Sequence, residues 1–154
     1  MGRAHAMTAM RRTTGTAALA LAMAVPAAAQ TPADSAAIRA AALDYIEGWY
    51  AGDAERMERA LHPELVKRIR VEDRESGRPF LDGMGAGRLI EGTRAGYGRE
   101  IPEADRRTDV TILDVVGNAA SVKVDAGPWV DYMHLSRWGD RWVIVNVLWE
   151  RTGD

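Results

Sequence analysis

The sequence predicts one α+β domain in which helices come first and a strongly curved antiparallel sheet follows. Apolar residues recur at helical spacing between residues 38 and 61, and period-two strands separated by compact turns fill residues 109–150. Helices followed by a run of sequential strands are typical of helices packed on one face of a sheet. We therefore expect two layers, with the helices on one face of the curved sheet.

The first 29 residues have the order of a secretory signal peptide. Arg11 and Arg12 precede an apolar run over residues 16–25, and small residues follow as far as the expected cleavage site before Gln30. The alternative is a membrane anchor, but a span needs roughly 20 apolar residues, and this run is too short. We expect a periplasmic or secreted bacterial protein with no membrane attachment after cleavage, and a single domain over residues 30–154.

Composition excludes several classes of function. The chain contains no cysteine, which excludes disulfides, zinc–thiolate sites and thiol nucleophiles. Without the first 29 residues, 17 basic residues stand against 22 acidic ones, a net charge of about −5. Phosphate binding requires clustered positive charge, so we expect no nucleic-acid partner.

Two helices are expected at the start of the domain. Residues 38–49 repeat apolar and aromatic side chains at helical spacing and end in a glycine-containing turn, which suits a helix C-terminus. Asp53 is placed to cap a second, shorter helix. That helix should end before Pro63, because the residue preceding proline is pushed out of the helical region.

The middle of the domain is less regular. Residues 64–71 fit either a helical turn or a strand, and we expect a short turn that runs into an edge strand. Residues 72–79 are charged and turn-rich, which predicts an exposed loop. Six glycines interrupt residues 83–98 at spacings that match neither a dinucleotide-binding nor a phosphate-binding loop. We therefore expect a short, marginally stable helix there.

Four strands are expected in the last third of the chain. Residues 109–116 and 119–126 form one hairpin around a Gly-Asn turn, and residues 129–138 and 141–150 form a second hairpin around Gly-Asp. Both faces of the second hairpin are substantially apolar. A sheet with one wetted face should alternate apolar with polar residues, so we expect each face to be covered.

Counting back from the turn assigns the two faces of the second hairpin. If the strands meet at Trp138, Asp131 pairs with Leu148 and Met133 pairs with Asn146, which places these four residues on the face toward the helices. The opposite face should pack on a second surface. Its predicted contact residues are Tyr132, His134, Trp138, Val145 and Trp149.

Four short motifs resemble the putative lumazine-binding family of the NTF2-like superfamily. They cover residues 42–53 (ALDYIEGWYAGD), 62–65 (HPEL), 130–135 (VDYMHL) and 139–146 (GDRWVIVN). The resemblance implies an NTF2-like cone in which a bent sheet wraps around the first helix, leaves a pocket and commonly dimerises through its outer face. It implies no single activity, because the superfamily includes ketosteroid-isomerase-like enzymes, SnoaL-like cyclases, dehydratases and non-catalytic modules.

Aromatic and polar residues in these motifs are candidates for the pocket. Tyr45 and Trp49 face the same way on the first helix and could stack on a flat ring, although such a stripe is more often plain core. Asp131 suits proton transfer, or it caps a turn or pairs with an arginine. Asn146 could orient a ligand carbonyl or bond to a neighbouring side chain. The predicted ligand-binding set is Tyr45, Trp49, His62, Asp131, Met133 and Asn146.

His62 is the second catalytic candidate beside Asp131. It could act as a general base or a metal ligand, or simply end the second helix as a hydrogen-bonded histidine. No second histidine lies at ligand spacing, so we expect no metal site, and no motif calls for a cofactor.

The leading hypothesis is an exported, dimeric domain that binds a small, flat or apolar molecule, without established catalysis. One alternative is a small acid–base enzyme of the isomerase or dehydratase type that uses Asp131 or His62. The other is a protein-interaction module that uses the outer face of the sheet.

Overall fold

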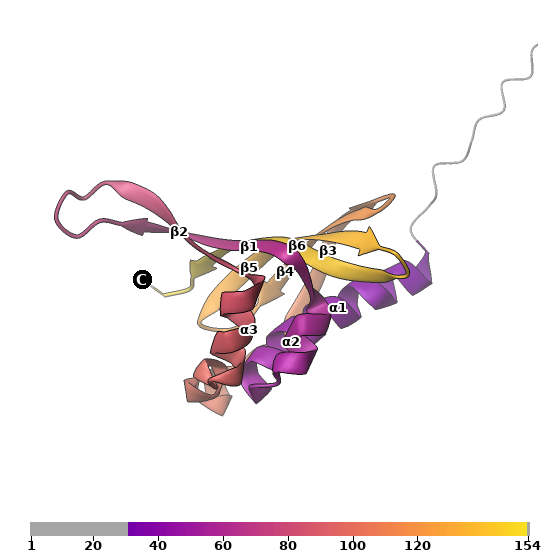
Figure 1. The fold of residues 1–154 in the computed structure, drawn as a ribbon, viewed down its shortest axis with the longest axis horizontal. Coiled ribbons are helices and arrows are strands. Elements are labelled where there is room, and N and C mark those ends of the chain that lie inside the picture. The colour runs from indigo at the N-terminus through magenta and orange to yellow at the C-terminus, as the bar shows by residue number, and fades with distance from the viewer. Residues whose placement is uncertain (1–30, 154) are drawn as a thin grey trace, which may run out of the picture.

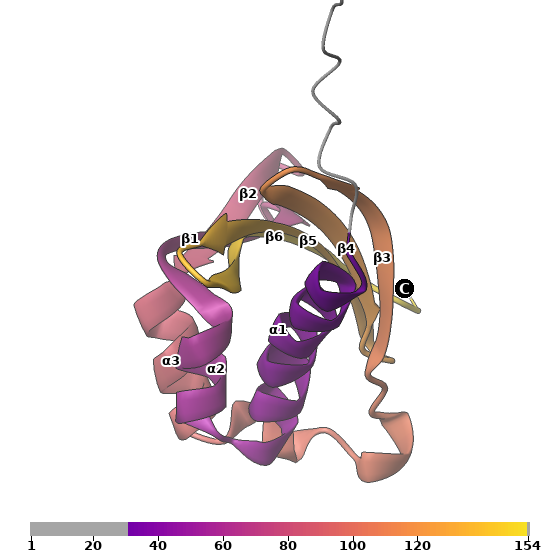
Figure 2. The same cartoon turned by 90° about the vertical axis from the view of Figure 1, so that its right-hand side faces the viewer.

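The computed structural model describes residues 31–153, and the predicted signal peptide lies outside them. Three helices pack against one face of a curved six-stranded sheet, which arches over the first helix (Figures 1 and 2). This arrangement confirms the α+β class. The elements in chain order are α1 (Pro32–Ala51), α2 (Ala54–Ala60), β1 (Leu61–Glu72), β2 (Pro79–Gly85), α3 (Ala86–Arg94), the 3₁₀ turns η1 (Tyr97–Glu100) and η2 (Glu103–Asp105), β3 (Asp109–Val116), β4 (Ala119–Asp125), β5 (Trp129–Trp138) and β6 (Arg141–Arg151).

Side-chain caps fix the ends of the first two helices. Thr31 and Asp34 form a reciprocal capping box at the start of α1, and Gly52 ends the helix with a left-handed φ of 65°. Asp53 then caps α2 as predicted, because its carboxylate accepts hydrogen bonds from the backbone N–H groups of Glu55 and Arg56 at 3.1 Å. The turn between the helices is therefore specified locally by the sequence.

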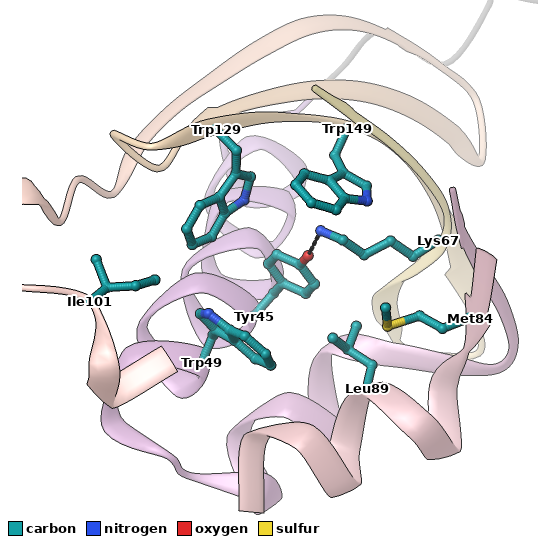
Figure 3. Close-up of a pocket in the computed structure, with 8 residues that line it drawn as sticks. All are labelled: Tyr45, Trp49, Lys67, Met84, Leu89, Ile101, Trp129 and Trp149. Carbon is teal, nitrogen blue, oxygen red and sulfur yellow. Dashed lines mark hydrogen bonds between the residues drawn. The ribbon is translucent and has the colours of Figure 1, made fainter. Parts of the chain in front are cut away.

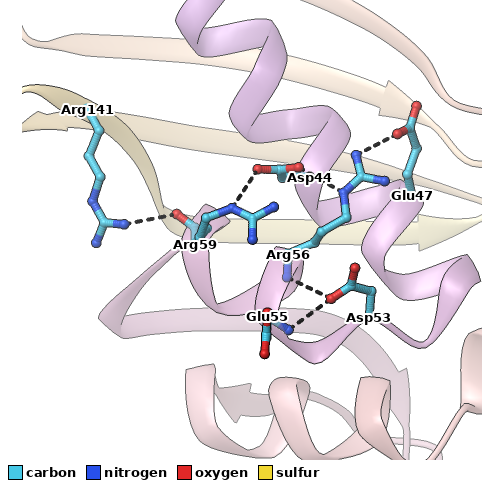
Figure 4. A network of polar contacts seen from close by, with 7 residues as sticks. All are labelled: Asp44, Glu47, Asp53, Glu55, Arg56, Arg59 and Arg141. Atoms are coloured by element: carbon cyan, nitrogen blue, oxygen red, sulfur yellow. Dashed lines mark hydrogen bonds and ion pairs between the residues drawn. The ribbon is translucent and has the colours of Figure 1, made fainter.

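An ion-pair network holds α2 against α1 (Figure 4). Arg56 reaches from α2 to Asp44 at 2.9 Å and to Glu47 at 2.6 Å, and Arg59 lies 3.4 Å from the same Asp44. Single exposed ion pairs contribute little to stability, but a shared arginine with two carboxylates fixes the angle between two short elements. The network lies on the polar side of α1, away from the cavity described below.

The six strands form one sheet in the order β2-β1-β6-β5-β4-β3. Every neighbouring pair is antiparallel except β1 and β6, which run parallel, so the sheet is mixed rather than wholly antiparallel. The predicted edge position of residues 64–71 is wrong, because β2 covers the outer side of β1. The β1–β2 hairpin extends beyond the rest of the sheet (Figure 1).

A β-bulge in β6 changes the register of the last hairpin. Trp138 pairs with Arg141 as predicted, but further along the strands a register shift pairs His134 with Asn146. Val145 is therefore the extra residue of the bulge. A single extra residue turns every following side chain of that strand to the opposite face of the sheet.

The bulge overturns the predicted faces for the second half of β6. Asp131 pairs with Trp149, one residue beyond the predicted Leu148, and the pairing of Met133 shifts in the same way. Trp149 consequently lies on the face toward the helices, where the sequence had placed Asn146. The predicted grouping of Asn146 with Asp131 is wrong, because sequence counting assumed an unbroken ladder.

The hydrophobic core lies between α1 and the concave face of the sheet. Alternate residues of β4 and β5 are buried there, and so are the inward residues of β6 as far as Val147. Within residues 31–153, no helix is long and apolar enough to cross a membrane. Fully buried core side chains include Ile38, Ala42, Ile46, Met57, Val122, Val124, Ile144 and Val147.

Candidate ligand-binding site

A cavity of about 240 Å³ opens between the helices and the concave face of the sheet (Figure 3). Its lining combines aromatic and aliphatic side chains with a single charged group, a composition typical of small-molecule sites. The volume admits a compact ligand of one or two rings. The lining residues are Tyr45, Trp49, Lys67, Met84, Leu89, Ile101, Trp129 and Trp149.

Helical spacing brings Tyr45 and Trp49 to the same side of α1, where both line the cavity. The Trp49 indole N–H is buried, and within residues 31–153 it is the one buried side-chain nitrogen or oxygen that lacks a hydrogen-bond partner. An unpaired buried donor costs free energy. A ligand with a hydrogen-bond acceptor would remove that cost.

Glycines allow the backbone to pack tightly around Trp49. A Cβ atom at Gly98 would lie 2.1 Å from the backbone oxygen of Trp49, so η1 contacts the end of α1 directly. A Cβ atom at Gly92 would lie 3.6 Å from the Trp49 ring and 3.3 Å from the ring of Tyr97. These two glycines of the 83–98 segment serve close packing rather than nucleotide binding.

Lys67 is the charged group of the cavity. It lies on β1 at an inward position between Leu65 and Ile69, and only 7% of it is exposed. Its Nζ donates hydrogen bonds to the Tyr45 hydroxyl at 2.6 Å and to Oδ1 of Asp131 at 2.5 Å. An ammonium group has three donors, so one N–H remains for a ligand.

Aromatic rings surround the same ammonium group. Lys67 Nζ lies 5.0 Å from the centroid of the Trp149 ring and 5.3 Å from that of Tyr45. Cations are attracted to the faces of such rings, most strongly where water is excluded. These contacts hold the amine in place toward the centre of the cavity (Figure 3).

Asp131 lies behind Lys67 and is fully buried. Its Oδ1 accepts the hydrogen bond from Lys67, and its Oδ2 accepts one from the indole N–H of Trp129 at 2.8 Å. A buried carboxylate requires both a counter-charge and hydrogen bonds to its remaining oxygen. Asp131 has both, and its partner is a lysine rather than the arginine that the sequence had suggested.

Tyr45 completes this cluster as a neutral phenol. Burial raises the pKa of Tyr45 well above its ordinary value, and the charge of Asp131 and its hydrogen bond to the phenol raise it further. The hydroxyl therefore keeps its proton beyond the pH at which a free tyrosine ionises. Lys67, Asp131 and Tyr45 form one polar cluster with no net charge in an otherwise apolar cavity.

Three residues of the predicted ligand-binding set, Met133, Asn146 and His62, belong neither to the cavity lining nor to the cluster of Lys67, Asp131 and Tyr45. Met133 is buried in the core and does not line the cavity. Asn146 faces the outer side of the sheet, where its side chain lies 3.3 Å from His134 and accepts a hydrogen bond from Arg68 at 3.2 Å. Asn146 therefore bonds to neighbouring side chains, which is the second of the two interpretations stated for it above.

His62 also lies outside the cavity lining. Its ring meets the ring of Trp138 edge-on at 4.5 Å, and its Nδ1 accepts a hydrogen bond from the backbone N–H of Glu64 at 3.1 Å. His62 therefore makes structural contacts as the second residue of β1, and it does not end α2, which stops at Ala60. Within the described chain, no group of three or more histidine, aspartate or glutamate side chains is suited to hold a metal ion.

The residues predicted for a dimer contact divide between the two faces. Trp149 lines the cavity. Tyr132 and Trp138 are exposed, at 48% and 60%, and His134 is exposed beside them on β5. Val145, the bulge residue, is half-buried. Leu148, which was predicted to face inward, is 50% exposed.

Sequence reasoning missed Lys67, although the sequence contains a signal for it. The period-two alternation of Leu65, Lys67 and Ile69 places all three on one face of a strand. A lysine among inward apolar positions indicates a buried amine. Residues 64–71 fit a helical turn as well as a strand, so the sequence alone does not establish that alternation.

The chain also matches known proteins. A model of the family described as putative lumazine-binding matches residues 33–150. No curated protein matches the chain. The structure is similar to an NTF2-like protein of unknown function from Methylobacillus flagellatus, with 18% identity and a TM-score of 0.59 over 81% of this chain and 97% of that one.

Two further solved structures are similar to it. One is an NTF2-like protein of unknown function from Shewanella baltica, with 17% identity and a TM-score of 0.55 over 81% of this chain and 99% of that one. The other is described as a putative dehydratase of the NTF2-like family from Streptomyces avermitilis, with 16% identity and a TM-score of 0.50 over 80% and 100% of the two chains. At these identities the likeness shows a shared fold alone.

Proposed function

The chain belongs to the putative lumazine-binding family of NTF2-like proteins, and we propose that it binds a small, flat, neutral molecule in its cavity. The observation that carries this proposal is the lining itself, in which the rings of Trp49, Trp129 and Trp149 line the same cavity as one fixed amine. Indole rings stack on flat ligands and bury large apolar areas.

The charges of the site support a neutral ligand. Lys67 is the only charged residue in the lining, and Asp131 neutralises it at 2.5 Å. A charged ligand would enter an apolar cavity with no free counter-charge, which is costly. The donors that remain are the third N–H of Lys67 and the indole N–H of Trp49. A ligand with carbonyl or ring-nitrogen acceptors matches them.

The test is a search for a bound molecule, followed by a binding measurement. Mass spectrometry of the purified protein under native and denaturing conditions should reveal a co-purified small molecule. Lumazine and other neutral bicyclic heterocycles should quench tryptophan fluorescence in the parent chain and in the control variant Tyr132→Ala. The variant Trp49→Leu should bind them at least about tenfold more weakly, because stacking on one ring contributes roughly 1–3 kcal/mol. Equal affinities in all three proteins would refute the proposal.

Acid–base catalysis by Asp131 is the second candidate function. The fully buried carboxylate, the amine of Lys67 and the phenol of Tyr45 lie within one hydrogen-bonded cluster at the cavity wall. Such clusters can move a proton to or from a bound ligand, as an isomerase or dehydratase requires. An activity screen of the parent protein beside Asp131→Asn and His62→Ala tests it. Only the Asp131 variant should lose turnover, and equal turnover in all three would remove both residues from catalysis.

Export and assembly complete the proposed function. The signal-like order of residues 1–29 supports a periplasmic or secreted protein, and N-terminal sequencing of the protein from its native cells should begin at Gln30.

The exposed side chains of Tyr132 and Leu148 support a homodimer, or a protein-interaction surface, on the outer face of the sheet. Light scattering of the parent and of Tyr132→Arg should give a dimer and a monomer, respectively.

A further inference from the structure

Lysine is rare in this chain, and one of its lysines is Lys67. Only two of the 20 basic residues in the sequence are lysines, at positions 67 and 123, and all the others are arginines. A guanidinium group stays charged in proteins and is not a nucleophile, whereas a buried amine can lose its proton and react. In an arginine-dominated chain, a lysine occupies the one charged position of the cavity lining.

The surroundings of Lys67 allow the amine to become a nucleophile. Asp131 accepts the short hydrogen bond from Nζ at 2.5 Å and lies in position to take the proton. Transfer of that proton leaves a neutral amine with a free lone pair beside a carboxylic acid. The phenol of Tyr45, 2.6 Å from Nζ, keeps its own proton and can donate it to an oxygen beside the amine.

We propose that Lys67 captures an aldehyde or ketone as an imine, which makes the cavity a covalent carbonyl-binding site. This inference rests on the proposed function and names its ligand class. The indole rings that line the cavity favour an aromatic or conjugated carbonyl compound, and the cavity volume of about 240 Å³ limits it to one or two rings.

The chemistry balances without an added reactant. The Lys67 ammonium gives a proton to Asp131, and the free lone pair forms a C–N bond to the carbonyl carbon while the C=O π pair moves to oxygen. That oxygen takes the proton from Asp131, and the new ammonium nitrogen returns a proton to the carboxylate. Protonation of the hydroxyl by Asp131 then releases water as the C–O bond breaks. The product is a protonated imine that keeps Asp131 as its counter-ion.

Reductive trapping tests the proposal on the whole protein. The folded chain is incubated with naphthaldehyde and cyanoborohydride, and the modified residue is located by peptide mass mapping. Reduction should fix one adduct on Lys67 at least about tenfold faster than on Lys123, because the cavity holds the carbonyl beside the amine. In protein unfolded by urea, the two lysines should react at similar rates.

Variants and a non-reactive analogue separate the possible outcomes. Lys123→Arg should keep the fast adduct, Lys67→Arg should lose it, and Asp131→Asn should form it more slowly. A folded protein that reacts equally fast at Lys123, or at neither lysine, overturns imine capture. Naphthalenemethanol lacks the carbonyl. If this alcohol quenches tryptophan fluorescence while no adduct forms, only imine capture fails; if it does not bind either, the proposed ligand site fails as well.

Discussion

Lys67 on β1 and Asp131 on β5 form their ion pair across the intervening strand β6, with Nζ 2.5 Å from Oδ1. The two strands do not contact each other in the sheet, so the long lysine side chain spans the gap over the concave face. Trp149 of β6 lies between them, pairs with Asp131 in the ladder and packs its ring against the ammonium group. The ion pair and the Trp149 ring together therefore link strands β1, β6 and β5.

Removing one charge of this pair should cost more stability than removing both. Asp131→Leu leaves the Lys67 ammonium buried without a counter-charge, and loss of one partner of a buried pair costs about 3–5 kcal/mol. The double variant Lys67→Met with Asp131→Leu should recover most of that loss. Urea unfolding of the parent and both variants measures the free energy of unfolding. A double variant less stable than Asp131→Leu would show that the two charges are not coupled.

Deleting Val145 should remove the bulge without exchanging the faces of β6. His134 already pairs with Asn146 and Asp131 with Trp149, so the shortened strand keeps the same partners in an unbroken ladder. The cavity should keep its indole wall, and bicyclic ligands should still quench tryptophan fluorescence. Val145→Ala keeps the bulge and serves as the control. Loss of quenching in the deletion variant but not in Val145→Ala would contradict this register.

Two glycines provide a matched pair of stability measurements. Gly98→Ala would place a Cβ atom 2.1 Å from the backbone oxygen of Trp49, and forced overpacking typically costs about 1–3 kcal/mol. Gly87→Ala in α3 meets no atom within 4 Å and should stabilise the helix by about 0.5–1 kcal/mol. The midpoint temperature of thermal unfolding should fall in Gly98→Ala and rise in Gly87→Ala. A shift in the same direction would disprove the close contact between η1 and α1.

Tyr50 should make stability decline at alkaline pH. Its hydroxyl donates to the backbone oxygen of Ala126 at 2.6 Å, and burial raises its pKa from 10.0 to about 12. Between pH 10 and 12 the unfolded chain releases this proton while the folded chain keeps it, so the free energy of unfolding falls as pH rises. Tyr50→Phe should lose about 1 kcal/mol at neutral pH and show a shallower alkaline decline. Equal slopes in the two proteins would argue against this linkage.

Local patterns in the sequence were sufficient for the helices and for the last hairpin. Helical spacing located α1, the short capping side chain of Asp53 located α2, and compact turns located β3 to β6. These signals depend on neighbours in the sequence, and each is strong over its own length. The position of β1 between β2 and β6 has no such local signal, because it depends on a pairing between distant segments.

Of the residues that line the cavity, the predicted ligand-binding set contained only those that helical spacing places. Tyr45 and Trp49 line the cavity because positions four apart share a helix face, whatever the sheet does. The wall formed by β6 depends on the bulge at Val145, which no residue pattern announces, so Asn146 and Trp149 were exchanged between the faces. Whether the cavity residues bind a ligand stays a prediction.

The parallel pairing of β1 with β6 sets the order in which this domain can assemble. Lys67 is matched with Val147, so the middle of the sheet closes only when the last stretch of the chain is available. Contacts between segments so far apart in sequence form slowly, because the intervening chain must first be gathered. Helices α1 and α2 carry their own local caps, whereas the cavity and its buried amine require the pairing of β1 with the far end of the chain.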